Sequence, residues 1–137
     1  MIKHRGLRHL ALNVKDVARA GNFYQRVFGM RIVWQPDADN AYLSSGCDNL
    51  ALHQGPAGER SAQSLDHLGF IVGSIEELEA GYQWAQENQL EIARPLGRHR
   101  DGSVSYYIRD LDGNVIQILY EPSVSSLTFN DRVKAEA

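Results

Sequence analysis

The sequence repeats itself after 58 residues, and this repeat limits the available folds more than any other feature. The shift places His9 on His67 and Asp16 on Ser74. Each half has the pattern of a strand, a helix and three further strands (βαβββ). A unit of roughly 55–60 residues buries little apolar surface and is only marginally stable by itself. We therefore expect the two halves to pack side by side.

The first half opens with an alternation of apolar and polar side chains over residues 7–14, which predicts a strand with one dry face. Asp16 is a suitable N-cap for a helix over residues 17–28. Gly29 suits the left-handed position that ends such a helix. Further strands are expected at residues 31–34, 41–44 and 49–53, with a turn over residues 36–40.

The second half repeats the opening alternation over residues 65–72. Ser74 and Glu77 have the spacing of a capping box, which predicts a helix from Ile75 to about Glu87. Further strands are expected at residues 90–93 and 103–108, joined by a charged loop over residues 95–102.

A tight turn at Asp112-Gly113-Asn114 precedes the last predicted strand, Val115–Tyr120. Side chains alternate along a strand, so Ile116 and Ile118 share one apolar face. Gln117 lies on the other face, which carries polar groups. A candidate function depends on what meets this polar face.

These patterns predict an α+β domain over residues 1–122. Module one is expected at about residues 6–54 and module two at about residues 65–121, with a linker over 55–64. The two modules are expected to form one curved mixed sheet, with the helices outside and a shared cleft. A polar tail follows over residues 123–137.

Composition excludes several classes of function. The net charge of -3 offers no basic surface for nucleic acid. No apolar run approaches the ~20 residues of a membrane span. The single cysteine, Cys47, excludes an intrachain disulfide and favours a cytoplasmic protein. Cys47 falls in a predicted turn, which favours a structural position over a nucleophile.

Two histidines occupy equivalent places in the repeat. In the expected arrangement His9 and His67 both point into the shared cleft. A single strand histidine is commonly structural, but a repeat-related pair favours a metal site. Without a metal, these side chains and Gln117 still line a polar cleft that can hydrogen-bond a ligand.

Four stretches carry a resemblance to a known family: Leu7–Leu10, Phe23–Met30, Leu65–Phe70 and Asp110–Ile118. Together they resemble the vicinal oxygen chelate superfamily, which includes glyoxalase I, extradiol dioxygenases, fosfomycin-resistance enzymes and bleomycin-resistance proteins. The resemblance covers roughly residues 6–121 and implies the paired βαβββ fold and a homodimer. It does not define the reaction, because the superfamily hosts many chemistries.

The resemblance also implies a set of metal ligands. Members that bind a metal use a histidine on the first strand of each module and a glutamate on the last strand. His9 and His67 match the two histidines, for a divalent ion such as Fe, Mn, Ni or Zn. The glutamate position holds Gln117, which keeps an oxygen donor and removes one charge. The position of a fourth ligand in module one falls near Ala51, which cannot coordinate.

Two residues are candidates for catalysis. Tyr107 resembles the tyrosine on the preceding strand that contacts a substrate oxygen in extradiol dioxygenases. His53 shares the alternation of Ala51 and could act as an acid, a base or a ligand. His99, in the charged loop, could reach over the mouth of the cleft and bind an anionic group.

Two hypotheses follow. The first is a cytoplasmic, divalent-metal-dependent enzyme acting on a small oxygenated molecule by isomerase, lyase or ring-cleaving dioxygenase chemistry. The second is a metal-free binding protein of the bleomycin-resistance type. Gln117 in the glutamate position favours the binder, whereas the paired histidines favour the enzyme.

Overall fold

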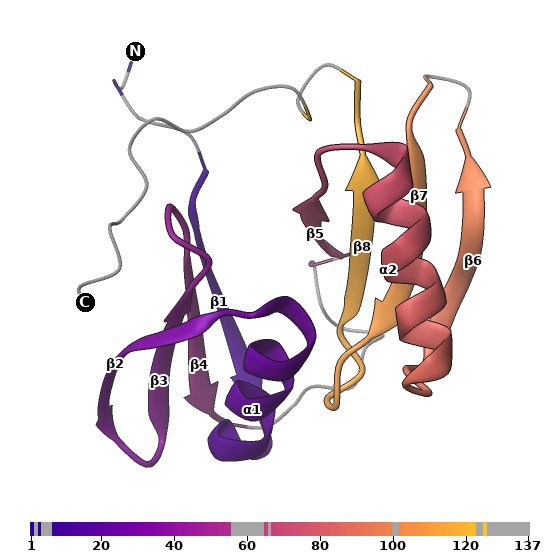
Figure 1. Cartoon of the computed structure of the whole chain (residues 1–137). Coiled ribbons are helices and arrows are strands. Elements are labelled where there is room, and N and C mark those ends of the chain that lie inside the picture. Colours follow the sequence, from indigo (N-terminus) through magenta and orange to yellow (C-terminus); the bar gives the residue numbers. More distant parts are fainter. Residues whose placement is uncertain are drawn as a thin grey trace. The chain divides into compact units, whose positions relative to one another are not determined.

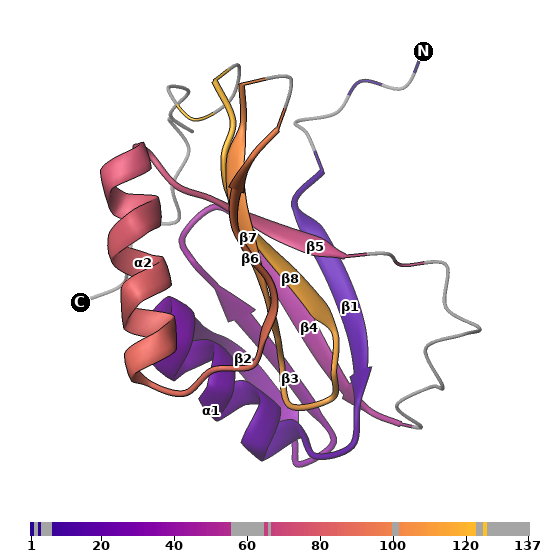
Figure 2. The ribbon, with the colours of Figure 1, turned by 90° about the vertical axis from the view of Figure 1, so that its right-hand side faces the viewer.

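Figures 1 and 2 present the computed structural model, which describes residues 1, 3, 7–55, 65, 67–99, 102–122 and 125. The chain divides into two compact units, residues 1–58 with 129–137 and residues 59–128. Most of the predicted linker and polar tail lies outside the described residues.

Unit one contains the first βαβββ module. Its elements are β1 (His9–Val14), α1 (Val17–Phe28), β2 (Arg31–Asp37), β3 (Asn40–Ser44) and β4 (Asn49–Gln54). They form a four-stranded sheet in the order β1-β4-β3-β2. β1 pairs with β4 in parallel, and the other pairs are antiparallel.

Unit two repeats this arrangement. Its elements are β5 (Leu68–Ile71), α2 (Ile75–Glu87), β6 (Ile92–Arg98), β7 (Val104–Arg109) and β8 (Val115–Tyr120). The strand order is β5-β8-β7-β6, again with one parallel pair, β5 with β8. The α+β class and the two βαβββ modules are confirmed. Backbone hydrogen bonds define two sheets, one for each module, rather than the single sheet expected from the sequence.

Both helices begin at side-chain caps that the sequence predicts. Asp16 Oδ1 accepts a hydrogen bond from the Arg19 N–H at 2.9 Å, and Ser74 Oγ accepts one from the Glu77 N–H at 3.1 Å. These bonds satisfy N–H groups that have no partner within the first turn. Gly29 ends α1 in the left-handed region at φ 64°. The helix starts are therefore confirmed, 58 residues apart.

The hairpin between β7 and β8 is built around Asp110. Its Oδ1 accepts hydrogen bonds from the backbone N–H groups of Asp112 at 3.0 Å and Asn114 at 2.7 Å. Gly113 adopts φ 79°, a conformation that favours glycine. The predicted turn is confirmed, and it brings Gln117 of β8 opposite Tyr107 of β7.

The core of each unit lies between the helix and one face of the sheet (Figures 1 and 2). In unit one, Leu12 and Val14 are buried, whereas His9 on the alternate face is exposed. In unit two, Ile116 and Ile118 are buried. Alternation therefore assigns His9 and Gln117 to the faces that the helices leave uncovered.

Two strands extend beyond their predicted ends. β2 continues through Pro36 to Asp37, and β6 continues through Pro95 to Arg98, where the sequence predicted a turn and a charged loop. Both are edge strands of their sheets. Proline lacks a backbone N–H. In an edge strand this N–H would face solvent rather than the neighbouring strand, so the strand can continue through the proline.

Neither helix of the described residues has the length and apolar character needed to cross a membrane.

Candidate functional site

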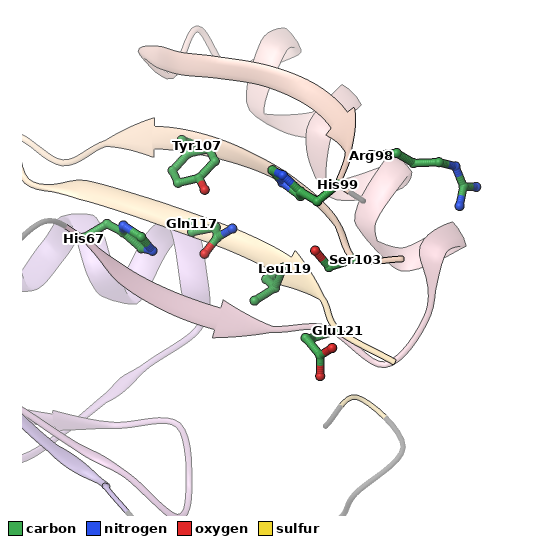
Figure 3. A pocket seen from close by; sticks show the side chains of 8 residues that line it. All are labelled: His67, Arg98, His99, Ser103, Tyr107, Gln117, Leu119 and Glu121. Atoms are coloured by element: carbon green, nitrogen blue, oxygen red, sulfur yellow. The ribbon is translucent and has the colours of Figure 1, made fainter. Parts of the chain in front are cut away.

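Unit two carries a pocket on the sheet face opposite α2. Figure 3 shows the side chains that line it: His67, Arg98, His99, Ser103, Tyr107, Gln117, Leu119 and Glu121. Three of the five site residues predicted from the sequence are therefore in one pocket: His67, Tyr107 and Gln117. His99, a candidate for the mouth of the cleft, is in the same pocket.

Gln117 lies at the centre of this face. In the strand register it is opposite Gly69 of β5 on one side and Tyr107 of β7 on the other. Its Nε2 donates a hydrogen bond to Ser105 Oγ at 3.1 Å. The carbonyl oxygen is on the side of His67 (Figure 3). No donor in the described part of the chain hydrogen-bonds this oxygen.

Ser105 joins Gln117 to His99. Ser105 is only 2% exposed, and its Oγ lies 2.7 Å from His99 Nε2. An amide NH₂ group can only donate, so the Ser105 oxygen accepts from Gln117 and keeps its own proton for another partner. His99 Nε2 is positioned to accept that proton.

Tyr107 connects His67 to a nearby cation. The His67 and Tyr107 rings meet edge to face, with centroids 5.5 Å apart. The guanidinium carbon of Arg94 lies 5.1 Å from the centre of the same tyrosine ring. Such ring and cation contacts hold an aromatic side chain in one orientation. The phenol is thus placed beside His67 and Gln117 in the pocket.

In unit one, His9 is oriented by the neighbouring strand. Its Nδ1 lies 2.7 Å from Oδ1 of Asn49, the residue opposite it in β4. An amide oxygen can only accept, so Nδ1 carries the proton. The other ring nitrogen, Nε2, then has a lone pair in the neutral imidazole. This arrangement is typical of a metal-binding histidine held by a second residue.

His53 has the same kind of partner on the same sheet. Its Nδ1 lies 2.7 Å from Asn40 Oδ1, and its ring meets Tyr42 edge to face at 5.9 Å. Nε2 of the neutral ring can therefore accept a proton. His53 and His9 lie at opposite ends of the register between β1 and β4, where their strand partners are Asn13 and Asn49.

The strand registers confirm which residue of module one is equivalent to Gln117. Ala51 lies opposite Ala11 of β1 and Tyr42 of β3, as Gln117 lies opposite Gly69 and Tyr107. A methyl group has no donor atom, so unit one offers no metal ligand at this position.

The donor atoms fit a divalent ion, although the set lacks a carboxylate. Within the described residues, no cluster of three His, Cys, Asp or Glu side chains could hold a metal. An amide oxygen lies outside those residue types, yet it is a ligand for hard cations, as imidazole is for transition metals. His67 and Gln117 supply one of each in the pocket of unit two.

Two supporting residues were not predicted. Ser105 follows the alternation of Tyr107 along β7, which was a usable signal for its place on the same face. Asn49 becomes the partner of His9 only through the register of β1 and β4, which the sequence does not display.

Comparison with known proteins places the chain in a family. A model of the Glyoxalase/Bleomycin resistance protein/Dioxygenase superfamily matches residues 6–118. The chain is 30% identical over 118 residues to the metallothiol transferase FosB of Staphylococcus haemolyticus, covering 83% of this chain and 82% of that protein. It is 26% identical over 130 residues to a probable trivalent organoarsenical cleaving enzyme of Bacillus subtilis, covering 90% and 85%.

The fold has relatives among solved structures. The crystal structure of lactoylglutathione lyase from Agrobacterium tumefaciens superposes with a TM-score of 0.72 at 22% identity, covering 90% of this chain and 97% of that one. The family match spans both modules and includes His9 of β1, His67 immediately before β5, and Gln117 of β8. The chain belongs to the glyoxalase/bleomycin resistance protein/dioxygenase superfamily, the vicinal oxygen chelate superfamily that its motifs resemble.

Proposed function

We propose that this protein is a divalent-metal-dependent enzyme that acts on a small, oxygen-rich molecule, with His9, His67 and Gln117 as the metal ligands. The observation that carries the proposal is the side-chain amide of Gln117, which is turned so that its carbonyl oxygen is on the side of His67 in one pocket. The hydrogen bond between His9 and Asn49 favours His9 as the third ligand, because it directs Nε2 of the ring away from Asn49.

A bound ion supplies a Lewis acid that polarises oxygens of the substrate. Two imidazoles and an amide are neutral, so the ion keeps its full charge, and the site favours a substrate with anionic oxygens. Tyr107 lies beside Gln117 and can donate a hydrogen bond from its phenol to a substrate oxygen. His53 Nε2 can accept a proton, because Nδ1 is engaged with Asn40.

The relatives suggest which reactions to assay first. The proteins that match at 30% identity are named metallothiol transferases, which makes thiol transfer the first reaction to assay. Isomerase, lyase and ring-cleaving dioxygenase reactions remain the other candidates from the sequence, because one fold can host many chemistries.

The metal content of the purified protein tests the proposal. We expect about one equivalent of a first-row divalent metal after dialysis at pH above ~7, where imidazoles are neutral. His67→Ala removes a ligand and should abolish retention. Asn13→Ala is the matched control, because it removes a polar side chain from the exposed face of β1 and leaves the three proposed ligands intact. Wild-type protein without metal, or His67→Ala with full metal, would contradict the proposal.

A metal-free binding protein is the second candidate. Gln117 in place of a carboxylate favours it, since a neutral donor holds a cation less tightly. In that case, ligand binding should persist in strong chelator, and the purified protein should retain no metal. Small-molecule binding measured by calorimetry with and without chelator separates the two functions.

A further inference from the structure

We propose that Ser105 and His99 are positioning residues that hold the Gln117 amide with its carbonyl oxygen, rather than its NH₂ group, directed toward His67. The inference rests on the proposed metal site. It adds Ser105, which neither the sequence patterns nor the family match assigns to that site, and it gives His99 a role other than the anion binding that the sequence suggested.

The need for such a device follows from the chemistry of an amide. The oxygen of a glutamine side chain can coordinate a cation, whereas its NH₂ group carries two donors and cannot. The two ends have nearly the same size, so packing alone does not select one of them. A neighbouring group that acts only as a hydrogen-bond acceptor for the NH₂ group is required to keep Gln117 in the coordinating orientation.

Ser105 provides that partner. Its Oγ lies 3.1 Å from Gln117 Nε2 and accepts a hydrogen bond there. The serine is 2% exposed, so bulk water does not compete for its hydroxyl group. A buried hydroxyl that accepts from Gln117 must still donate its own proton, or it loses a hydrogen bond.

His99 fixes the direction in which the Ser105 hydroxyl group donates. Its Nε2 lies 2.7 Å from Ser105 Oγ and accepts the serine proton when the ring carries its own proton on Nδ1. His99 is fixed in turn by its backbone, since its N–H donates to Ser103 O at 2.8 Å. The direction of donation therefore runs from Gln117 to Ser105 to His99, which leaves the amide oxygen for the pocket.

The opposite arrangement uses the same three side chains. A proton on His99 Nε2 would point at Ser105 Oγ and leave the serine proton free to be donated to the oxygen of Gln117, which would reverse the amide. The NH₂ group would face His67, and the metal site would lose one ligand. The Nδ1-protonated tautomer of His99 therefore holds the serine proton away from Gln117, whereas the Nε2-protonated tautomer releases it.

A carboxylate would not need this control, because its two oxygens are equivalent. That difference gives the test its design. Mn²⁺ affinity is measured by electron paramagnetic resonance of the free ion for wild type, Ser105→Ala, Gln117→Glu and the double variant. We expect Ser105→Ala to weaken binding about 10–100-fold in the wild-type background, as supporting residues of metal sites do. In the Gln117→Glu background the same change should cost less than about threefold, because no orientation has to be selected.

Ser44→Ala is the matched control. Ser44 is also a buried serine with a hydrogen-bonded hydroxyl, but it belongs to unit one and contacts Asp48. It should leave Mn²⁺ affinity unchanged. An equal loss from Ser105→Ala in both backgrounds would mean that the serine acts only through stability, and no loss in either would also overturn the proposal.

The tautomer of His99 tests the orientation without any metal. Long-range ¹H–¹⁵N NMR at about pH 8, where ordinary imidazoles are neutral, should find the proton on Nδ1. A proton on Nε2 would overturn the proposed role of His99, because the ring could not then accept the serine proton, but it would not contradict the metal site. Failure of both wild type and Gln117→Glu to bind Mn²⁺ would instead contradict the proposed function, while the tautomer still tests the role of His99.

Discussion

His9 Nδ1 and Asn49 Oδ1 face each other across β1 and β4 at 2.7 Å, so the asparagine fixes both the tautomer and the direction of the imidazole. We predict that Asn49→Ala weakens metal binding by about 10–100-fold, because the ring loses the partner that orients Nε2. Asn49→Asp keeps an acceptor in place and should retain or strengthen binding. Competition with a chromogenic chelator measures both affinities.

Asn40 provides a control for this prediction, since it makes the same bond to His53. Asn40→Ala should leave metal affinity within about threefold of wild type. Equal losses from Asn49→Ala and Asn40→Ala would mean that the two asparagines act on general stability rather than on a ligand.

His53 is predicted to act in proton transfer rather than in metal binding. His53→Phe preserves an aromatic ring beside Tyr42 but removes the ring nitrogen that can accept a proton. Turnover should fall by about 10²–10⁴-fold while the metal content stays at the wild-type level. Loss of metal from His53→Phe to the extent seen in His67→Ala would reassign His53 as a ligand.

Gly81 is predicted to be required by the packing of α2 against β7. A Cβ added at this position would lie 2.8 Å from the Tyr106 hydroxyl oxygen, and the Tyr106 ring is itself packed on Tyr82 at 5.0 Å. Gly81→Ala should therefore destabilise the protein by about 1–2 kcal/mol in urea unfolding. In a Tyr106→Phe background the clash is gone, and the better helix propensity of alanine should make the same change neutral or stabilising.

Stability should fall at high pH because of Tyr106. Burial raises the pKa of Tyr106 from 10.0 to about 12, since the phenolate is desolvated in the fold. Between these values the unfolded chain loses the proton that the folded chain keeps, so rising pH favours unfolding. The contribution is present in full below pH 10 and is lost as pH rises to about 12. Urea unfolding at several pH values measures the free energy of unfolding. In Tyr106→Phe this free energy should fall less steeply between pH 10 and about 12 than in wild type.

The parts of the fold that the sequence predicted best are those with local chemical signals. Asp16 and Ser74 cap their own helices, and the turn at Gly113 needs a positive φ that glycine supplies. Each of these signals acts within a few residues. The starts of α1, α2 and β8 could therefore be predicted from the sequence without knowledge of the tertiary structure.

The parts that were missed depend on long-range pairing. Pro36 and Pro95 indicate a loop when they are read locally, but at the edge of a sheet each is compatible with a strand. The partners of the candidate ligands depend on register in the same way, since Asn49 is 40 residues from His9 and Ser105 is 12 residues from Gln117. Alternation predicts the face of a side chain, but only the register identifies its neighbour.

Anomalous diffraction from crystals of the zinc-loaded protein tests the central claim most directly. The account predicts one peak per chain, about 2.0–2.2 Å from an imidazole nitrogen of His9, an imidazole nitrogen of His67 and Oε1 of Gln117. A peak bound by other side chains, or a Gln117 whose NH₂ group faces the ion, would contradict it.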